Sequence, residues 1–450
     1  MLTWSFNERG NQPLYEYLYC CIREDIRSGR LRAGEKLPSK RALAQHNGIS
    51  VMTVENAYAQ LLSEGYILSR PRQGFFVAEL PSVKAPKVRT ATPVPQPASV
   101  PAHWLADFTS NQTCRDSFPF TTWSATVRRV LSEQQERLLT NPPWGGIPEL
   151  REAIAEHLAA FRGLSVRPEQ ILIGAGTEYL YGLLLQLIGL DKIYGFEVPG
   201  YGKIGRIYAS HGVRCEAIPM DVSGVMISAL EEQHVDVVHI SPAHHFPTGL
   251  VVPATRRYEL LRWAEQGRYI IEDDYDSEFR MAGRPIPTLQ SIDRDERVIY
   301  MNTFSKTLAS TVRIAYMVLP EHLLRRYQQT MSFYSCTVSN FEQYTLAAFI
   351  RQGSFERHLN RMRTDYHRRR DLLLRLLREH PLAERVSVSG EDGGLHFLLH
   401  VKTDLPDELM EKKAAEKGVR LNALSRYDGD KKTLHSFVIN YSSVPAEVMP

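Results

Sequence analysis

The sequence has little of what disulfide frameworks, metal sites and membrane spans require. No two of its five cysteines form a CxxC pair, and none stands at metal-ligand spacing with histidine. No apolar run is long enough to cross a bilayer, and no signal-peptide core follows the first residues. These absences predict a cytoplasmic protein with reduced thiols, no bound metal and no membrane partner.

An excess of one charge sign is also missing, because 54 lysines and arginines face 51 aspartates and glutamates. The net charge of +3 excludes a basic surface over the whole molecule, so any nucleic-acid site must be local. Apolar residues, in contrast, make up 43% of the chain, as in soluble globular proteins. At 450 residues the chain exceeds the roughly 250–300 residues at which one core stops growing, which predicts two or more domains.

One stretch divides the chain. Residues 81–103 contain six prolines, three cations and no acidic residue, a composition typical of semi-extended linkers. The alternative is a long loop within one domain, but unstructured loops beyond about 15 residues are uncommon in compact domains. We therefore predict a small domain over 1–80, a linker over 81–103 and a large domain over 104–450.

The small domain has helical patterning followed by a hairpin pattern. A first helix is predicted by the apolar stripe Leu14, Leu18, Ile22 and Ile26. Two more helices follow, with Ser39 and Ser50 as their N-caps, and the second is expected to bury Val54, Tyr58, Leu61 and Leu62. The segment YILSRPRQGFFVA then reads as two short strands around a basic turn. Three helices and a hairpin predict a winged helix-turn-helix.

In such a fold, the second helix of the pair enters the major groove of double-stranded DNA, and cations at its edges contact phosphates. Met52 would also be exposed on that helix. The residues predicted to bind DNA are Ser39, Lys40, Arg41, Ser50, Thr53, Asn56, Arg70, Arg72 and Gly74. Each signal is weak alone, because a basic hairpin is usually a solvated turn and a helix-turn-helix can be purely structural.

The segment RLRAGEKLPSKRALAQHNGIS, together with TVENAYAQLLSEGYILSRPRQGFFV, resembles the GntR family of bacterial transcription regulators along the whole small domain. The resemblance implies binding of promoter DNA. One position departs from the family, which often carries an arginine after the serine that opens the recognition helix. Here that position is Val51, so base preference cannot be taken from relatives.

In the large domain, short apolar runs alternate with amphipathic helices, which predicts an α/β doubly wound sheet. Three strand ends carry suggestive residues: GAGT at 174–177, Asp273 with Asp274, and Lys306 between Ser305 and Thr307. Taken alone, GAGT would be an ordinary turn, the two aspartates a helix cap or a metal site, and the lysine a surface charge. Ligands of such sheets bind at strand carboxyl ends, and together the residues fit pyridoxal phosphate. This cofactor needs a Schiff-base amine, a carboxylate at its pyridine nitrogen and donors for its phosphate.

Residues 108–441 resemble fold-type I aminotransferases, through GGIPELREAIAEHLAAFRG, SPAHHFPTG, IEDDYDSEFR and TFSKTLASTVRIAYMVLP. A GntR-type DNA-binding domain joined to such a domain is the layout of the MocR/GabR-type regulators. The resemblance implies that the large domain has a mixed sheet with helices on both faces. The resemblance implies Lys306 as the Schiff-base lysine, Asp273 at the pyridine nitrogen, Tyr275 at the ring hydroxyl and Tyr201 stacked on the ring. Its implied phosphate ligands are Gly176, Thr177, Thr303, Ser305 and Arg313.

Two positions depart from the aminotransferases. Phe246 stands where they have the asparagine of NPTG, which contacts the ring hydroxyl. Val438 stands where many have an arginine that binds the substrate α-carboxylate. Lys203, Arg206 or Arg426 could supply another anion site, and the spacing does not choose among them.

These features support a homodimeric transcription regulator that senses pyridoxal phosphate or an amine, since fold-type I sites are built at a subunit interface. An alternative is an active aminotransferase that carries a DNA-binding domain, whereas the regulator would retain at most transaldimination or a weak half-transamination. A third is a DNA-binding repressor whose large domain only dimerises, although the retained lysine opposes it.

Overall fold

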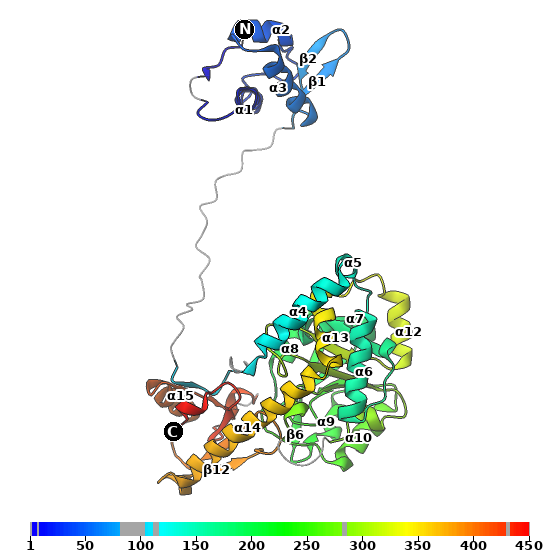
Figure 1. Cartoon of the computed structure of the whole chain (residues 1–450), viewed down its shortest axis with the longest axis vertical. Coiled ribbons are helices and arrows are strands. Elements are labelled where there is room, and N and C mark those ends of the chain that lie inside the picture. Colours follow the sequence, from blue (N-terminus) through cyan, green and yellow to red (C-terminus); the bar gives the residue numbers. More distant parts are fainter. Residues whose placement is uncertain are drawn as a thin grey trace. The chain divides into compact units, whose positions relative to one another are not determined.

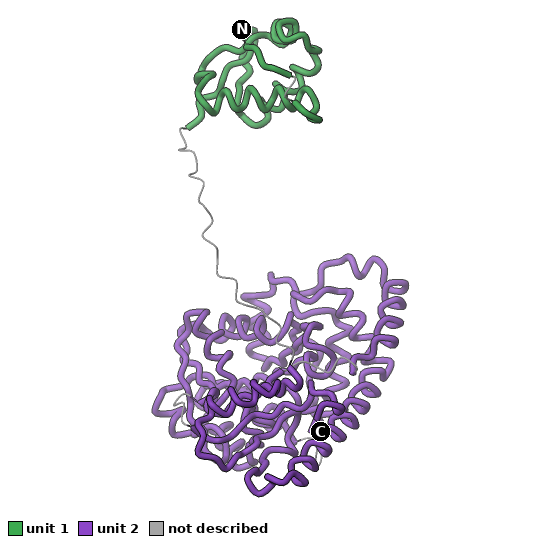
Figure 2. Tube along the Cα trace, turned by 90° about the vertical axis from the view of Figure 1, so that its left-hand side faces the viewer, with its two compact units in different colours: residues 1–100 green, residues 101–450 purple. Residues whose placement is uncertain are grey.

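The computed structural model describes residues 2–6, 9–81, 104–110, 117–280, 286–428 and 433–449. The chain forms two compact units, Met1–Val100 and Pro101–Pro450, which Figure 2 shows in different colours. Each unit has an apolar core of its own. Nearly all of the predicted linker, residues 82–103, lies outside the described residues.

The N-terminal unit consists of three helices and a two-stranded sheet (Figure 1). Its elements are α1 (Leu14–Arg27), α2 (Lys40–Asn47), α3 (Val51–Ser63), β1 (Ile67–Arg70) and β2 (Gly74–Val77). Local chemistry sets the helix ends. The Ser39 hydroxyl accepts a hydrogen bond from the Ala42 N–H, and the Ser50 hydroxyl accepts one from the Thr53 N–H. The strands β1 and β2 pair antiparallel, so the predicted winged helix-turn-helix is present.

The core of this unit is built on the predicted helical stripes. Leu18, Ile22, Val54 and Leu61 are fully buried, whereas Leu14, the first residue of the stripe on α1, is only half-buried. Leu62 was also expected in the core, but it is only half-buried, because it follows Leu61 by one residue and so points about 100° further round the helix.

The large unit is organised around an eight-stranded sheet with strand order β4-β11-β10-β9-β8-β5-β6-β7. The strands are β4 (Ile171–Gly174), β5 (Ile193–Val198), β6 (Arg214–Asp221), β7 (Gly224–Val225), β8 (Val237–Ile240), β9 (Tyr269–Asp273), β10 (Val298–Thr303) and β11 (Ala315–Val318). Strands β6, β5, β8, β9 and β10 run parallel, whereas β11 is antiparallel to both neighbours. The sheet is therefore mixed, and the carboxyl ends of its parallel strands meet along one edge.

Both faces of this sheet are buried, because successive residues of one strand enter different cores. In β4, Ile171 and Ile173 belong to one apolar cluster and Leu172 to another. The first cluster packs under α4 (Phe120–Gln134), α6 (Pro148–Arg162), α13 (Asn340–Arg351) and α14 (Ser354–Glu379), which Figure 1 shows together. The second includes residues of α7 (Thr177–Ile188), α8 (Lys203–Ser210) and α12 (Glu321–Thr330). Further elements are α5 (Glu136–Leu139), α9 (Ile227–Glu232), α10 (Ala254–Ala264) and α11 (Leu289–Ile292).

A second, antiparallel sheet lies in the C-terminal part of the large unit, with order β12-β13-β16-β15. Its strands are β12 (Val386–Ser389), β13 (His396–Val401), β16 (Ser436–Asn440) and β15 (Asn422–Ala423), and α15 (Asp407–Glu416) contacts it. The first described strand of the unit, β3 (Ala106–Asp107), pairs with β14 (Val419–Arg420). Among the described residues, no helix has the length and apolar character needed to span a membrane.

Candidate functional site

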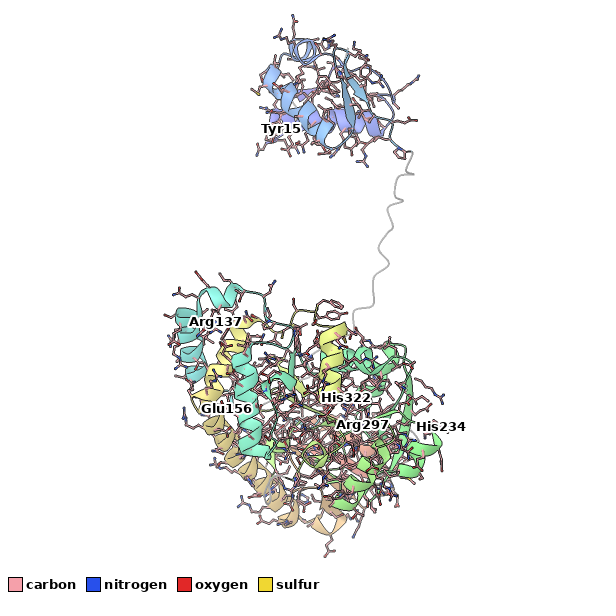
Figure 3. The ribbon with its side chains drawn as sticks, turned by 90° about the vertical axis from the view of Figure 1, so that its right-hand side faces the viewer. Tyr15, Arg137, Glu156, His234, Arg297 and His322 are labelled. Carbon is pink, nitrogen blue, oxygen red and sulfur yellow. The ribbon has the colours of Figure 1, made fainter. Side chains whose placement is uncertain are left out.

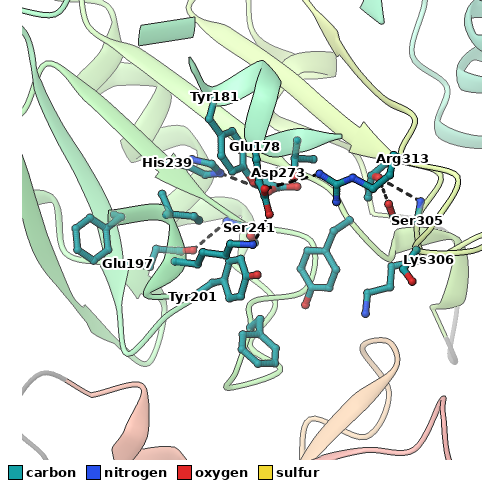
Figure 4. Close-up of a pocket in the computed structure, with 18 residues that line it drawn as sticks. Glu178, Tyr181, Glu197, Tyr201, His239, Ser241, Asp273, Ser305, Lys306 and Arg313 are labelled. Carbon is teal, nitrogen blue, oxygen red and sulfur yellow. Dashed lines mark hydrogen bonds and ion pairs between the residues drawn. The ribbon is translucent and has the colours of Figure 1, made fainter. Parts of the chain in front are cut away.

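A pocket of about 290 Å³ opens at the carboxyl ends of β9 and β10, beside the first turn of α7 (Figure 4). Eight of the nine residues predicted to bind the cofactor line it: Thr177, Tyr201, Asp273, Tyr275, Thr303, Ser305, Lys306 and Arg313. The ninth, Gly176, lies directly behind the Arg313 side chain. Residues separated by more than a hundred positions thus surround one space because parallel strands end at the same edge.

Lys306 follows β10 and lines the pocket. Desolvation by the surrounding protein lowers the pKa of its amine to about 8, although the negative charge of Asp276 acts in the opposite direction. Near neutral pH, a lysine with this pKa is deprotonated far more often than an ordinary one. A neutral amine is what attack on an aldehyde carbon requires.

Asp273, at the end of β9, has one satisfied and one unsatisfied oxygen. Its Oδ2 accepts a hydrogen bond from the Tyr181 hydroxyl at 2.7 Å and lies 3.4 Å from Nε2 of His239. Its Oδ1 is buried and has no hydrogen-bond partner among the described residues. A buried carboxylate oxygen without a donor is unfavourable, and the N–H of a protonated pyridine ring would satisfy it.

The other end of the pocket is suited to a phosphate. The first turn of α7 presents backbone N–H groups and the positive end of the helix dipole. Thr303 Oγ1 donates to the hydroxyl of Ser305 at 2.9 Å and accepts from the Ser305 N–H at 3.2 Å. The Arg313 guanidinium, half-exposed, lies 3.7 Å from Glu178. Hydroxyl, amide and guanidinium donors therefore gather where the resemblance predicts a phosphate.

Aromatic and aliphatic side chains form the opposite wall. Tyr201, Phe246, Phe196 and Ile204 line the pocket, and the rings of Tyr201 and Phe246 meet edge to face at 6.2 Å.

Val438 lies behind this wall, on β16, and is almost completely buried. It packs with Leu398 and Leu424 in an apolar cluster against which Phe246 also packs. The position at which the resemblance predicts a carboxylate-binding arginine is thus apolar, and its partners on the neighbouring strands are Leu398 and Asn422.

The three alternative cations differ in their surroundings. Lys203 lines the pocket and forms an ion pair with Glu178. Arg426 instead pairs with Glu411 on α15. Arg206 is not among the residues that line the pocket. Of the three, the geometry favours Lys203 as an anion contact.

Sequence reasoning missed several residues that line the same pocket. Tyr181 and His239, which hold Asp273, come from α7 and β8. Glu197, at the end of β5, lines the pocket and accepts from the Ser241 N–H at 3.0 Å, and burial raises its pKa to about 8. Only the pairing of distant strands brings these groups together, so no local motif indicates them.

A second missed group lies beside Lys306. Nδ1 of His244 is 2.9 Å from Asp276 and 3.4 Å from the Tyr275 hydroxyl, and its ring is 4.4 Å from that of His396. Side-chain atoms of His244, Asp276 and His396 lie within 4.8 Å of one another, a spacing compatible with a metal ion. Because Nδ1 of His244 already bonds the carboxylate, we interpret the group as a hydrogen-bonded support for Tyr275. The absence of a metal stays a prediction.

The residues predicted to bind DNA lie on the N-terminal unit. Arg41, Asn56 and Arg72 are exposed, and Arg72 adopts a left-handed backbone (φ 61°) in the turn between β1 and β2. Ser50 and Thr53 form the N-cap of α3, as Ser39 does for α2, and Gly74 opens β2. Two predicted phosphate contacts have partners within the unit: Lys40 binds Glu55 at 2.6 Å, and Arg70 stacks over Phe76 at 4.7 Å.

Comparison with known proteins agrees with both halves of the structure. Residues 105–427 match the family "Aminotransferase class I and II", and residues 14–77 match "Bacterial regulatory proteins, gntR family". The chain is 39% identical to the uncharacterized HTH-type transcriptional regulator YdeL of Bacillus subtilis, over 94% of this chain and 92% of that protein. It is 31% identical to the probable rhizopine catabolism regulatory protein MocR of Rhizobium meliloti, over 97% and 92%. The chain belongs to the MocR-type transcription regulators.

Another member of this family, the pyridoxine biosynthesis transcriptional regulator PdxR of Corynebacterium glutamicum, is 32% identical over 94% of this chain and 90% of that protein. Among solved structures, a multiple substrate aminotransferase from Thermococcus profundus superposes with a TM-score of 0.68 at 25% identity, covering 77% of this chain and 89% of that one. The predicted combination of a GntR-type DNA-binding domain with a fold-type I aminotransferase-like domain is therefore confirmed. This class of domain is pyridoxal-phosphate dependent.

Proposed function

We propose that this MocR-type regulator binds promoter DNA through its N-terminal unit and pyridoxal phosphate through Lys306, and that the cofactor pocket is its sensor. The buried Asp273 Oδ1, which has no partner among the described residues, carries the proposal. It faces a pocket that also contains a lysine of lowered pKa and a cluster of phosphate donors. Bound there, the cofactor would supply an aldehyde for Lys306 and an aromatic ring for Tyr201 to cover.

The roles of the surrounding residues follow from their positions. Asp273 would keep the pyridine nitrogen protonated, with Tyr181 and His239 orienting its carboxylate. Tyr275 would contact the ring hydroxyl. The phosphate would be held by Thr177, Thr303, Ser305 and Arg313 beside the first turn of α7.

The surroundings of Val438 bear on the effector. An α-amino acid normally gains a bidentate arginine contact for its carboxylate, whereas here that region is an apolar cluster. Such ligands would place a carboxylate in low-dielectric surroundings without a counter-ion. Two effectors remain, namely an amine whose carboxylate is absent or far enough from the nitrogen to reach Lys203, and pyridoxal phosphate itself. We favour the cofactor, because a cofactor sensor needs no substrate anchor.

A homodimer would bring two DNA-binding domains to two half-sites. Support for it comes from large apolar side chains that are exposed on the large unit. Phe120, Leu131 and Leu139 lie on α4 and α5, and Phe333, which is 76% exposed, follows the end of α12. Figure 3 labels Arg137 of α5, whose guanidinium lies 5.0 Å from the ring of Tyr344 on α13. Exposed apolar groups of this kind mark interfaces.

The alternative function is an active aminotransferase with a DNA-binding domain. Lys306, Asp273 and Arg313, gathered in one pocket, favour it, whereas the apolar surroundings of Val438 oppose it. Steady-state assays with amino donors and keto acids separate the two functions. We expect no turnover beyond a slow half-reaction, and sustained turnover with a common α-amino acid would favour the enzyme.

The proposal is tested by a spectral titration of the holoprotein with α-amino acids, ω-amino acids and simple amines, run beside DNA-binding assays of the apo and holo forms. Without the arginine contact, worth about 1.5–3 kcal/mol, common α-amino acids should bind at least tenfold more weakly than a typical aminotransferase substrate. An α-amino acid that changes the spectrum at micromolar concentration would contradict our interpretation of Val438.

A further inference from the structure

The exposed face of the recognition helix has an unusual composition for a DNA-binding domain. Helix α3, with the sequence VMTVENAYAQLLS, contains no lysine or arginine. Its first turn instead exposes two apolar side chains, Val51 at 43% and Met52 at 64%. Asn56 is also exposed and follows Met52 by four residues, so the two share one side of the helix. The N-terminal residues of a recognition helix are those that meet base edges in the major groove.

The other polar side chains on this face are already engaged. Ser50 shares a hydrogen bond of 2.8 Å with Thr53, and Gln60 donates to Glu64 at 3.0 Å. Glu55 binds Lys40 at 2.6 Å. Within the part of the chain that the structure describes, the Asn56 amide has no hydrogen-bond partner. Asn56 is therefore the side chain of this face whose amide donors and acceptor are all available, whereas the Ser50 and Thr53 hydroxyls, which bond to each other, do not distinguish between bases.

These side chains have definite base preferences. Guanine is read mainly by arginine or lysine at O6 and N7, and α3 offers neither. Asparagine forms a bidentate pair with N6 and N7 of adenine, and apolar side chains contact the C5-methyl group of thymine. On the basis of the proposed DNA binding, we infer that α3 reads A·T base pairs, with Val51 and Met52 on thymine methyl groups and Asn56 on an adenine.

One residue could support the opposite reading. A glutamate can accept a hydrogen bond from N4 of cytosine, which would select G·C. Glu55 is the candidate, but the Lys40 ammonium on α2 holds its carboxylate. Unpaired, this carboxylate would also be repelled by the phosphates. Glu55 is therefore a contact between the two helices rather than a base reader.

The test begins with selection of binding sites by the full-length protein from a random duplex library. In the selected site, each thymine is replaced in turn by deoxyuridine, which removes the C5-methyl group and nothing else. Wild-type protein should lose about three- to tenfold in affinity at one or two thymines. Met52→Ala should bind the unmodified site more weakly and should no longer distinguish thymine from uracil at one of them.

Asn56 is tested in the same way with 7-deazaadenine, which lacks the N7 acceptor. Wild type should lose at least fivefold at one adenine, in line with the discrimination of good bidentate pairs, and Asn56→Ala should be indifferent there. Val51→Arg should create a preference for guanine at one position. Glu55→Gln is the matched control on the same helix and should leave the selected sequence unchanged.

The inference is overturned if no thymine-to-uracil replacement affects wild-type binding, or if Glu55→Gln relaxes selection at a cytosine. Folding of each variant is checked by circular dichroism, and the substituted side chains are exposed, so loss of structure is not expected. Selection is run with and without pyridoxal phosphate. A wild type that selects A·T pairs equally in both conditions supports the inference, even though the sensor proposal would then fail.

Discussion

A Cβ atom on Gly176 would lie 2.5 Å from Nη2 of Arg313, so the guanidinium occupies the space that any other side chain would need. Gly176 also has φ of +91°, a region that residues with a Cβ rarely adopt. The glycine at the start of α7 thus lets the arginine approach the helix N-terminus, and the two together shape the proposed phosphate site.

We predict that Gly176→Ala displaces Arg313 and weakens binding of pyridoxal phosphate by at least tenfold, while binding of unphosphorylated pyridoxal changes little. Equilibrium dialysis of both compounds measures this. Gly163→Ala is the matched control, because its φ is +63° but a Cβ there meets nothing within 4 Å. Equal losses for both compounds would show that Gly176 does not act through the phosphate.

Asp276 and burial act in opposite directions on Lys306, because burial lowers the pKa of the amine and the carboxylate raises it. The rate at which apoprotein forms a Schiff base with pyridoxal phosphate should therefore rise with pH around a midpoint near 8. Asp276→Asn removes the negative charge, so the midpoint should move to lower pH. Exposed Asp295→Asn serves as the control. A midpoint that stays in place or moves upward would contradict the assigned role of Asp276.

Arg41 and Arg72 should contact phosphates rather than bases, since both are exposed at the edges of the recognition surface. Each change to alanine should weaken binding to every DNA sequence and reduce the salt dependence by about one phosphate contact. Affinity measured across a range of salt concentrations gives the slopes. Arg27→Ala, on α1, is the comparison. If a slope remains that of the wild type, the arginine is not a phosphate contact.

Borohydride reduction of the holoprotein should fix the cofactor on Lys306, and peptide mapping identifies the labelled residue. Lys306→Ala should lack the visible absorption band of the Schiff base. Lys203→Ala is the control, because Lys203 lines the same pocket but is paired with Glu178. A label on any other lysine would refute the assignment.

The sequence predicted those parts of the fold that depend on local chemistry. Ser39 and Ser50 cap helices because their hydroxyls reach N–H groups three residues ahead. The run at 171–174 is a strand buried on both faces, as its continuous apolar character indicates. The same local patterns misplace two residues: Leu14, on the predicted stripe of α1, and Leu62, which the periodicity does not separate from Leu61, are both only half-buried.

The sequence predicted those residues of the candidate site that lie within motifs of a known family. Lys306, Asp273 and Arg313 stand in such motifs, and the pocket contains all three. Tyr181, His239 and Glu197 could not be predicted, because their roles depend on which strands are neighbours. Strand β8 lies between β9 and β5 in the sheet, and that order brings His239 to Asp273.

The central claim is that the cofactor on Lys306 is the signal for DNA binding. Fluorescence anisotropy with the protein's promoter DNA, for wild type and Lys306→Ala with and without pyridoxal phosphate, tests it most directly. Pyridoxal phosphate can change DNA affinity only if it binds the DNA-bound and DNA-free protein with different affinities. A tenfold difference in Kd corresponds to about 1.4 kcal/mol. We predict that pyridoxal phosphate changes the wild-type Kd at least threefold and leaves that of Lys306→Ala unchanged. Identical Kd values for the apo and holo wild type would contradict the claim.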